Sequence, residues 1–116
     1  MKKSKILVVD DNTKILYAFQ SFLEKEGYIS IPLSEGGKVM NIIAREKPTM
    51  VFLDISLPGQ DGLEILREIK KVQPSLPVII VSGHITDENR ERALALGALD
   101  FLEKPLSLAK IRELLN

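Results

Sequence analysis

The chain has 116 residues, 45% of them hydrophobic and 28% charged, which is typical of one globular domain spanning residues 1–116. Its 16 basic residues balance its 16 acidic ones, so the charge does not favour a nucleic-acid or membrane surface. The chain contains no cysteine, which excludes disulfides and thiolate metal sites. The apolar run Ile6–Val9 is too short for a signal peptide, and no run is long enough to span a membrane. We therefore expect a cytoplasmic protein whose domain does not itself bind DNA.

Five short runs of aliphatic and β-branched residues predict β-strands. Continuous apolar runs of this length are typical of strands that are covered on both faces. The second run contains Pro32, which favours a position at the edge of a sheet. The predicted strands are Ile6–Val9, Tyr28–Leu33, Met50–Leu53, Val78–Val81 and Leu99–Leu102.

Segments with apolar residues at helical spacing follow each of these runs. Asp11 or Asn12 is a candidate N-cap for the first helix, and Ser107 for the last. The strict alternation of strand and helix predicts an α/β fold with a parallel sheet and helices on both faces. We expect a flavodoxin-like (βα)5 fold with strand order 2-1-3-4-5. The expected apolar helix faces lie within Ile15–Leu23, Val39–Ile43, Leu63–Val72, Ala93–Leu96 and Leu108–Leu115.

Polar and charged residues stand where four of the predicted strands end. Asp10 and Asp11 follow the first strand, and Asp54 follows the third. Ser82 follows the fourth strand, and Lys104 follows the fifth. Because the carboxyl ends of parallel strands open on one edge of the sheet, these side chains are expected to share one crevice.

Taken singly, each of these residues is most simply a loop residue or a helix cap, but together they indicate a site. Three carboxylates in one cleft repel one another unless a cation is present. With oxygen ligands only, Mg²⁺ or Mn²⁺ is favoured over Zn²⁺. The ammonium of Lys104 and the hydroxyl of Ser82 are suited to hold phosphoryl oxygens. A carboxylate placed there could act as a nucleophile and form an acyl phosphate.

Four segments carry a family resemblance by their motifs, order and spacing: VVDD (Val8–Asp11), LDISLPGQDG (Leu53–Gly62), VSG (Val81–Gly83) and GALDFLEKP (Gly97–Pro105). They resemble the receiver domains of two-component response regulators. VSGH and DFLEKPLS are most similar to the receivers attached to sigma-54-dependent activators. The resemblance covers nearly the whole chain and implies a phosphoacceptor signalling domain, with no enzymatic activity beyond its own phosphorylation and dephosphorylation.

The resemblance also implies a role for each residue of the predicted site. Asp54 would take the phosphoryl group from a sensor histidine kinase or a phosphotransfer protein. Mg²⁺ would be bound directly by Asp11, Asp54 and the main-chain carbonyl of Ser56, with Asp10 acting through water. Lys104 would pair with Asp54 and then with the phosphoryl group, and a cis peptide bond would precede Pro105.

Two further residues are implied to switch the surface of the domain. The hydroxyl of Ser82 would move onto the phosphoryl oxygens, and the ring of Phe101 would turn inward with it. The fourth helix, fifth strand and fifth helix would then present a changed face to an output domain or a target protein. The chain fits a stand-alone receiver and the receiver of a longer regulator equally well.

The residues two places beyond Asp54 and Ser82 are expected to border the path of the water that hydrolyses the acyl phosphate. Ser56 is small and leaves that path open. His84, the only histidine, either obstructs or positions the water, or is an ordinary exposed loop residue. We favour obstruction, because a bulky ring fills the path in either protonation state.

Two other functions compete with the receiver interpretation. Aspartyl phosphatases of the haloacid dehalogenase type use an Asp-x-Asp motif, whereas this chain has Asp54-Ile55-Ser56 and lacks the second acid. A flavodoxin-like binding domain without phosphorylation would not need three acids together with Ser82 and Lys104. Both alternatives are therefore weaker than the receiver interpretation.

Overall fold

The computed structural model describes residues 3–116 and contains five strands and five α-helices in strict alternation. A short 3-10 helix, Gly36–Lys38, precedes the second α-helix. The strands are β1 (Lys5–Val9), β2 (Ile29–Leu33), β3 (Met50–Asp54), β4 (Val78–Ser82) and β5 (Asp100–Glu103). The helices are α1 (Thr13–Lys25), α2 (Val39–Glu46), α3 (Gly62–Val72), α4 (Asp87–Ala95) and α5 (Leu108–Leu115).

The five strands form one parallel sheet in the order β2-β1-β3-β4-β5, which confirms the predicted topology. The strand that contains Pro32 lies at the edge, where the missing N–H of proline costs the fewest ladder hydrogen bonds. The order of the strands in the sheet differs from their order in the chain at β1, which lies between β2 and β3. This switch point places the ends of β1 and β3 side by side.

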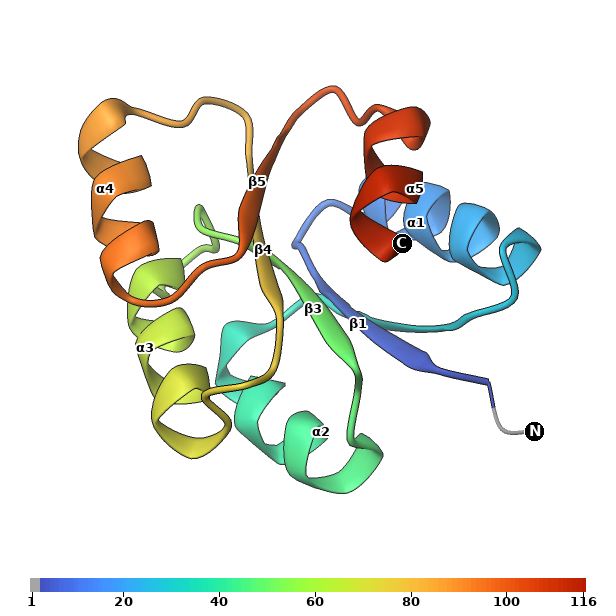
Figure 1. The fold of residues 1–116 in the computed structure, drawn as a ribbon, viewed down its shortest axis with the longest axis horizontal. Coiled ribbons are helices and arrows are strands. Elements are labelled where there is room, and N and C mark those ends of the chain that lie inside the picture. Colours follow the sequence, from blue (N-terminus) through green and yellow to red (C-terminus); the bar gives the residue numbers. More distant parts are fainter. Residues whose placement is uncertain (1–2) are drawn as a thin grey trace.

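Helices cover both faces of the sheet, as Figure 1 shows: α1 and α5 lie on one face, and α2, α3 and α4 on the other. Phe19 and Phe52 pack with ring centroids 4.9 Å apart beneath α1. The larger apolar cluster lies on the opposite face and contains residues of α2, α3 and α4. Burial on both faces explains why the central strands are continuous apolar runs. No helix in residues 3–116 is long and apolar enough to cross a membrane.

Side-chain caps begin four of the helices, including α3, where the side chain of Asp61 accepts from the N–H of Leu63. Of the two candidates for α1, Asn12 is the N-cap, and its side-chain oxygen accepts hydrogen bonds from the N–H groups of Lys14 and Ile15. Ser107 caps α5 as predicted, and Thr86 caps α4. These caps satisfy donors that the first turn of a helix leaves free.

The observed strands differ from the predicted ones by a residue at several ends. Asp54 and Ser82 are the last residues of β3 and β4 and do not follow them, because the ladder continues to the pairs Asp54–Val81 and Ser82–Glu103. The last strand begins at Asp100, one residue later than expected, and Leu99 is largely exposed. The polar side chains at these strand ends are thus held by the sheet itself.

Candidate functional site

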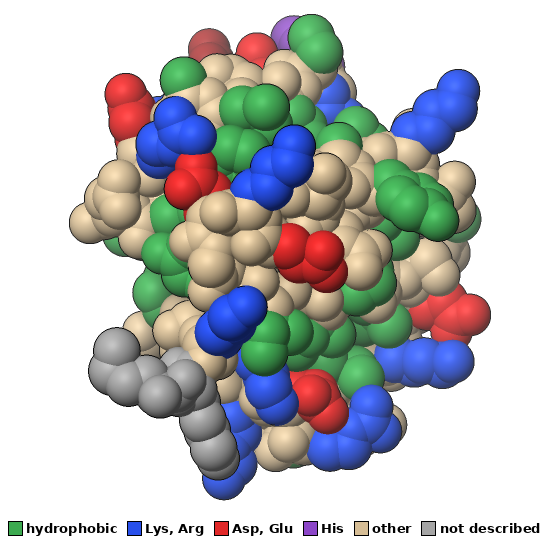
Figure 2. Space-filling model, turned by 90° about the vertical axis from the view of Figure 1, so that its right-hand side faces the viewer, with side chains coloured by type: hydrophobic (Ala, Val, Ile, Leu, Met, Phe, Trp, Pro, Cys, Tyr) green, Lys and Arg blue, Asp and Glu red, His purple; other side chains and the backbone are tan. Residues whose placement is uncertain are grey.

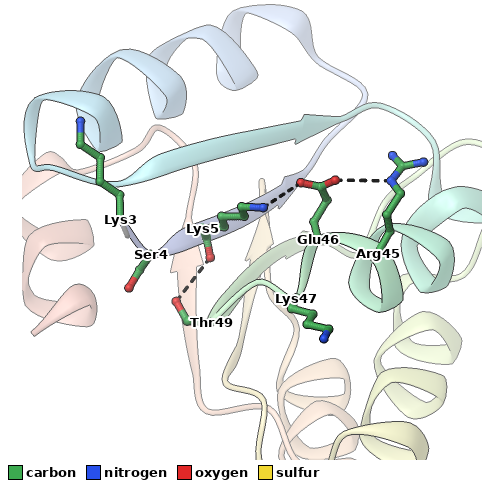
Figure 3. A pocket seen from close by; sticks show the side chains of 7 residues that line it. All are labelled: Lys3, Ser4, Lys5, Arg45, Glu46, Lys47 and Thr49. Atoms are coloured by element: carbon green, nitrogen blue, oxygen red, sulfur yellow. Dashed lines mark hydrogen bonds and ion pairs between the residues drawn. The ribbon is translucent and has the colours of Figure 1, made fainter. Parts of the chain in front are cut away.

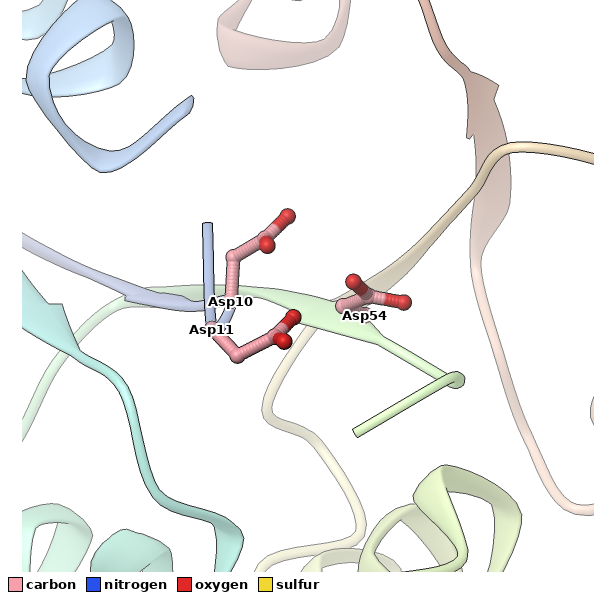
Figure 4. Close-up of side chains that lie close together, drawn as sticks. All are labelled: Asp10, Asp11 and Asp54. Atoms are coloured by element: carbon pink, nitrogen blue, oxygen red, sulfur yellow. The ribbon is translucent and has the colours of Figure 1, made fainter. Parts of the chain in front are cut away.

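The three acidic residues predicted to converge lie together at the carboxyl ends of β1 and β3. Val9 pairs with Leu53, so the next residues along the two strands, Asp10 and Asp54, stand beside each other. Oxygens of Asp10, Asp11 and Asp54 lie within 4.8 Å of one another. Figure 4 shows the three side chains close together, with Asp54 on β3 beside Asp10 and Asp11. Asp10 and Asp54 are buried, whereas Asp11 is exposed and leaves the cluster open to solvent.

Both carboxylate oxygens of Asp54 are engaged. Its Oδ1 accepts a hydrogen bond of 2.8 Å from the main-chain N–H of Ser56, and its Oδ2 accepts one of 3.0 Å from Nζ of Lys104. The side chain is only 3% exposed. Charge-assisted hydrogen bonds of this kind compensate a buried carboxylate and fix its orientation. A strand can therefore end on a buried aspartate at this position.

Lys104 contacts two of the acids and not only the one expected. Its Nζ lies 2.9 Å from Oδ2 of Asp10, in addition to its hydrogen bond with Asp54. The main-chain N–H of Lys104 donates to the carbonyl of Ser82 at 2.9 Å, and the peptide bond to Pro105 is cis as implied. Burial alone would lower the pKa of Lys104, but the close contacts with the two aspartates and their negative charge outweigh it and raise the pKa. The ammonium therefore remains charged in the site.

Asp10 is the least well compensated of the three acids. Burial raises the pKa of its carboxyl group, and the neighbouring charge of Asp54 adds to the rise, against the hydrogen bond from Asn12 and the ion pair with Lys104. Its Oδ1 accepts a hydrogen bond from the N–H of Asn12 at 2.9 Å. Its buried Oδ2 lies in ion-pair contact with Lys104, but the angles of that contact do not make a hydrogen bond. One buried oxygen is thus left able to bind a further positive group.

The donor set fits a hard divalent cation. Three carboxylates lie within reach of a single ion, one of them presents solvent-exposed oxygens, and one buried oxygen lacks a hydrogen bond. Three carboxylates against the single ammonium of Lys104 also leave an excess of negative charge. Oxygen ligands without cysteine or histidine are the set that Mg²⁺ and Mn²⁺ prefer.

Ser82 is buried at the end of β4, and its hydroxyl bonds within its own loop. Oγ donates a hydrogen bond to the carbonyl of His84 at 2.9 Å and accepts one from the N–H of His84 at 3.2 Å. The side chain of His84 is exposed, and so is Ser56 beyond β3. The predicted roles of Ser56 and His84 in the lifetime of an acyl phosphate remain predictions.

Phe101 lies in β5 and is only 8% exposed, within the apolar cluster beneath α2, α3 and α4. The guanidinium of Arg90 in α4 covers the ring, with its central carbon 4.6 Å from the ring centroid. The predicted switching of Phe101 is a matter of movement and stays a prediction. The contact with Arg90 was not expected from the sequence.

Gly62 allows the loop after Asp54 to fold back onto the end of β3. A Cβ atom at this position would stand 2.3 Å from Cα of Ile55 and 2.9 Å from the carbonyl oxygen of Asp54. Both neighbours are main-chain atoms, which cannot move aside cheaply. Only glycine therefore fits this close approach, which fixes the loop that carries Ser56.

Two surface hollows differ in their relation to the acids. One, of about 420 Å³, lies at the amino end of β1 and is lined largely by Lys3, Lys5, Arg45 and Lys47 (Figure 3). The only acid there, Glu46, contacts Lys5 at 3.1 Å and Arg45 at 3.4 Å. This hollow is remote from the acidic cluster. Another, of about 370 Å³, includes Asp11 and adjoins the cluster.

A family model, the response regulator receiver domain, matches residues 6–116. The chain belongs to this family. It is 34% identical over 113 residues to sporulation initiation phosphotransferase F of Bacillus subtilis, covering 97% of this chain and 91% of that protein. It is 39% identical over 108 residues to the nitrogen assimilation regulatory protein NtrX of Azorhizobium caulinodans, covering 91% of this chain but 24% of NtrX.

A solved structure supports the same assignment. The CheY-like receiver domain protein of Methanospirillum hungatei superposes with a TM-score of 0.93 at 32% identity, covering 98% of this chain and 91% of that one. The receiver domain is thus a phosphoacceptor signalling domain of two-component systems, as the sequence motifs implied. The haloacid dehalogenase and plain binding-domain alternatives do not share this family assignment.

Within the receiver domain, sequence reasoning identified the acids, Lys104 and Ser82 but missed three features. These are the ion pair between Asp10 and Lys104, the close approach at Gly62, and the cover of Phe101 by Arg90. Gly62 follows Asp61 directly before an apolar helical stripe, which signals a tight loop-to-helix entry. Nothing in the sequence distinguishes Arg90 from the other charged residues of α4.

Proposed function

We propose that Asp54 is the residue that accepts the phosphoryl group, in a reaction that depends on Mg²⁺. The observation that carries the proposal is the placement of Asp54, a buried carboxylate hydrogen-bonded to Lys104 and beside two further acids at an open sheet edge. Asp10 is also buried beside Lys104 in the same cluster, but among residues 3–116 Asp54 is the buried acid whose two carboxylate oxygens accept hydrogen bonds from Ser56 and Lys104. Such a combination is typical of sites that handle phosphoryl groups.

The donor is a phosphohistidine of a sensor histidine kinase or of a phosphotransfer protein. A carboxylate oxygen of Asp54 forms a bond to phosphorus, and the bond from phosphorus to the donor's imidazole nitrogen breaks. The electron pair stays with that nitrogen, which takes up a proton from solvent. The ammonium of Lys104, already 3.0 Å from Asp54, provides positive charge beside the transferred group. The domain thereby promotes its own modification and does not turn over a separate substrate.

Asp10, Asp11 and Asp54, with the main-chain carbonyl of Ser56, would hold the metal ion. When bound, Mg²⁺ would supply positive charge that offsets the charge of the phosphoryl oxygens. The three acids position this charge, because β1 and β3 are neighbours in the sheet. Manganese would fit the same oxygen ligands.

The output is a changed surface on α4, β5 and α5 that meets an output domain or a target protein. Phosphorylation shifts an existing equilibrium of this surface, because ligands act through their different affinities for two states. We place this signalling in the cytoplasm and assign no nucleic-acid or membrane contact to the domain. On the face drawn in Figure 2, acidic, basic and apolar side chains are interspersed. Such a mixed face does not present the basic stripe that a nucleic acid requires.

Replacement of the acceptor tests the proposal. The wild-type domain, incubated with acetyl phosphate and Mg²⁺, should gain one phosphoryl group by mass spectrometry, and Asp54→Asn should gain none. Asp61→Asn is a matched control, since asparagine also accepts the hydrogen bond with which Asp61 caps α3. Stoichiometric labelling of Asp54→Asn would refute the assignment, as would labelling that is unchanged after removal of divalent metal.

A further inference from the structure

Helix α4 is attached to the rest of the domain by few contacts. Of its nine residues, DENRERALA, only Ala93 is buried. A helix with so little buried apolar surface gains little stability from packing. Its position therefore depends on few side-chain contacts, which include Ala93 in the core and Arg90 over the ring of Phe101. The cap by Thr86 fixes the start of the helix relative to the preceding loop.

Arg90 is the side chain that connects α4 to the ring of Phe101. Its guanidinium lies over the ring face at 4.6 Å, a distance at which a cation is attracted to an aromatic ring. Within residues 3–116 it forms no ion pair, although α4 also carries Asp87, Glu88 and Glu91. The ring beneath it is almost fully buried. Arg90 thus covers the outer face of a ring whose other contacts lie in the core.

Two sets of hydrogen bonds, joined by the main chain from His84 to Thr86, lie between Ser82 and Arg90. The hydroxyl of Ser82 exchanges hydrogen bonds with the main chain of His84. Two residues later, Thr86 accepts at its side chain from the N–H of Asn89 at 3.1 Å. Its carbonyl accepts from the N–H of Arg90 at 2.9 Å. Any displacement of the loop 83–86 therefore reaches the turn of α4 that bears Arg90.

We propose that Arg90 is a positioning residue that holds the ring of Phe101 in its buried orientation and couples this ring to the loop after Ser82. The proposal rests on the function proposed above, since a phosphoryl group on Asp54, or its mimic, is what draws Ser82 away from its loop. Movement of Ser82 releases the main chain of His84, and the first turn of α4 follows the loop. Arg90 stays over the buried ring, which is the orientation expected of the switched state, so that α4 and β5 switch together.

Beryllofluoride with Mg²⁺, a mimic of the phosphoryl group, gives a direct test by nuclear magnetic resonance of the 116-residue chain. In the free protein the δ-protons of Arg90 should be shifted upfield by the ring current of Phe101. In Arg90→Ala the signals of Phe101 should no longer shift when beryllofluoride is added, whereas those of Ser82 and Gly83 should still shift. Because the contact with Arg90 favours the buried orientation of the ring, beryllofluoride should bind to Arg90→Ala about two- to fivefold more weakly than to the wild type.

Two further variants give the test its controls. Arg90→Lys keeps a cation over the ring and should restore most of the response, which a loss of folding would not allow. Arg92→Ala removes a second arginine from the same helix, one without a contact to an aromatic ring, and should behave as wild type.

An unchanged response of Phe101 in Arg90→Ala would overturn the inference, and so would an equal effect of Arg92→Ala. Absence of Arg90 from the ring-current-shifted signals would overturn it as well. If the wild type itself did not respond to beryllofluoride, the proposed function would fail first. The two failures are therefore distinguishable.

Discussion

The hydroxyl of Ser82 donates its hydrogen bond to the main-chain carbonyl of His84, at 2.9 Å, so its proton is already engaged within the loop after β4. To bond a phosphoryl oxygen on Asp54, the hydroxyl must exchange one acceptor for another. Such an exchange has a small net free energy, because one hydrogen bond is lost for each one gained. This balance is what a two-state switch requires.

Removal of this hydroxyl should separate phosphorylation from switching. We expect Ser82→Ala to bind beryllofluoride with Mg²⁺, because Asp54, its neighbouring acids and Lys104 remain. The chemical-shift changes over residues 86–96 and 99–103 that the wild type shows should nearly disappear. Ser82→Thr keeps the hydroxyl and should preserve them. Full-sized changes in Ser82→Ala would show that the hydroxyl does not drive the switch.

Asp10→Asn should make the metal-free domain more stable at neutral pH. Burial and the charge of Asp54 raise the pKa of Asp10, so the folded state disfavours its ionised form. Above this raised pKa the wild type carries the full penalty, and we expect the variant to melt a few degrees higher. As the pH falls through the raised pKa towards the ordinary value of 3.8, the penalty and the difference vanish.

Thermal melts of both proteins over this pH range, without divalent metal, measure the effect. Added Mg²⁺ should stabilise the wild type and raise the melting temperature of Asp10→Asn much less, since one acid of the site is lost. A variant that melts lower than the wild type at neutral pH would contradict the expected cost of the buried charge.

Gly62→Ala should destabilise the domain and disturb the acceptor loop. The added Cβ meets main-chain atoms of Ile55 and Asp54, so the loop has to shift. We expect a loss of about 1–3 kcal/mol in the free energy of unfolding, the usual cost of overpacking. Denaturant titration measures it, with Gly37→Ala as the control because a Cβ there has ample room. Equal stability of the two variants would show that the loop yields easily.

His84→Ala should speed the loss of the phosphoryl group from Asp54 severalfold. The ring of His84 is exposed two residues beyond Ser82, where we expect it to obstruct the approach of water. The affinity for Mg²⁺ should be nearly unchanged, because His84 is not one of the clustered acids. The decay rate of the phosphorylated protein, measured together with a Mg²⁺ titration, tests this role of His84. An unchanged rate would make His84 an ordinary surface residue, and a slower rate would make it a water-positioning group.

The sequence predicted the fold and the acidic site because both follow from short-range patterns. Apolar runs set the strands, and parallel topology then brings Asp10, Asp54 and Lys104 to one edge. Contacts that depend on side-chain direction could not be predicted in this way. The contact of Arg90 with Phe101 is of this kind. In the sequence, Arg90 is one of several charged residues on a solvent-exposed helix, and nothing in their pattern sets it apart. Strand ends were predicted to within a residue, because hydrogen-bond ladders extend beyond the apolar core.

Because of Lys104, the site is complete only when the whole sheet has formed. It directly follows β5, the last strand of the sheet, yet it contacts acids at the ends of two strands that lie two and three places away across the sheet. A chain in which β5 has not yet docked holds its acids without their ammonium partner, and a chain in which β1 and β3 are apart has no cluster at all. If Asp54 is the acceptor as proposed, a molecule whose sheet is incomplete lacks the arrangement needed to take up a phosphoryl group.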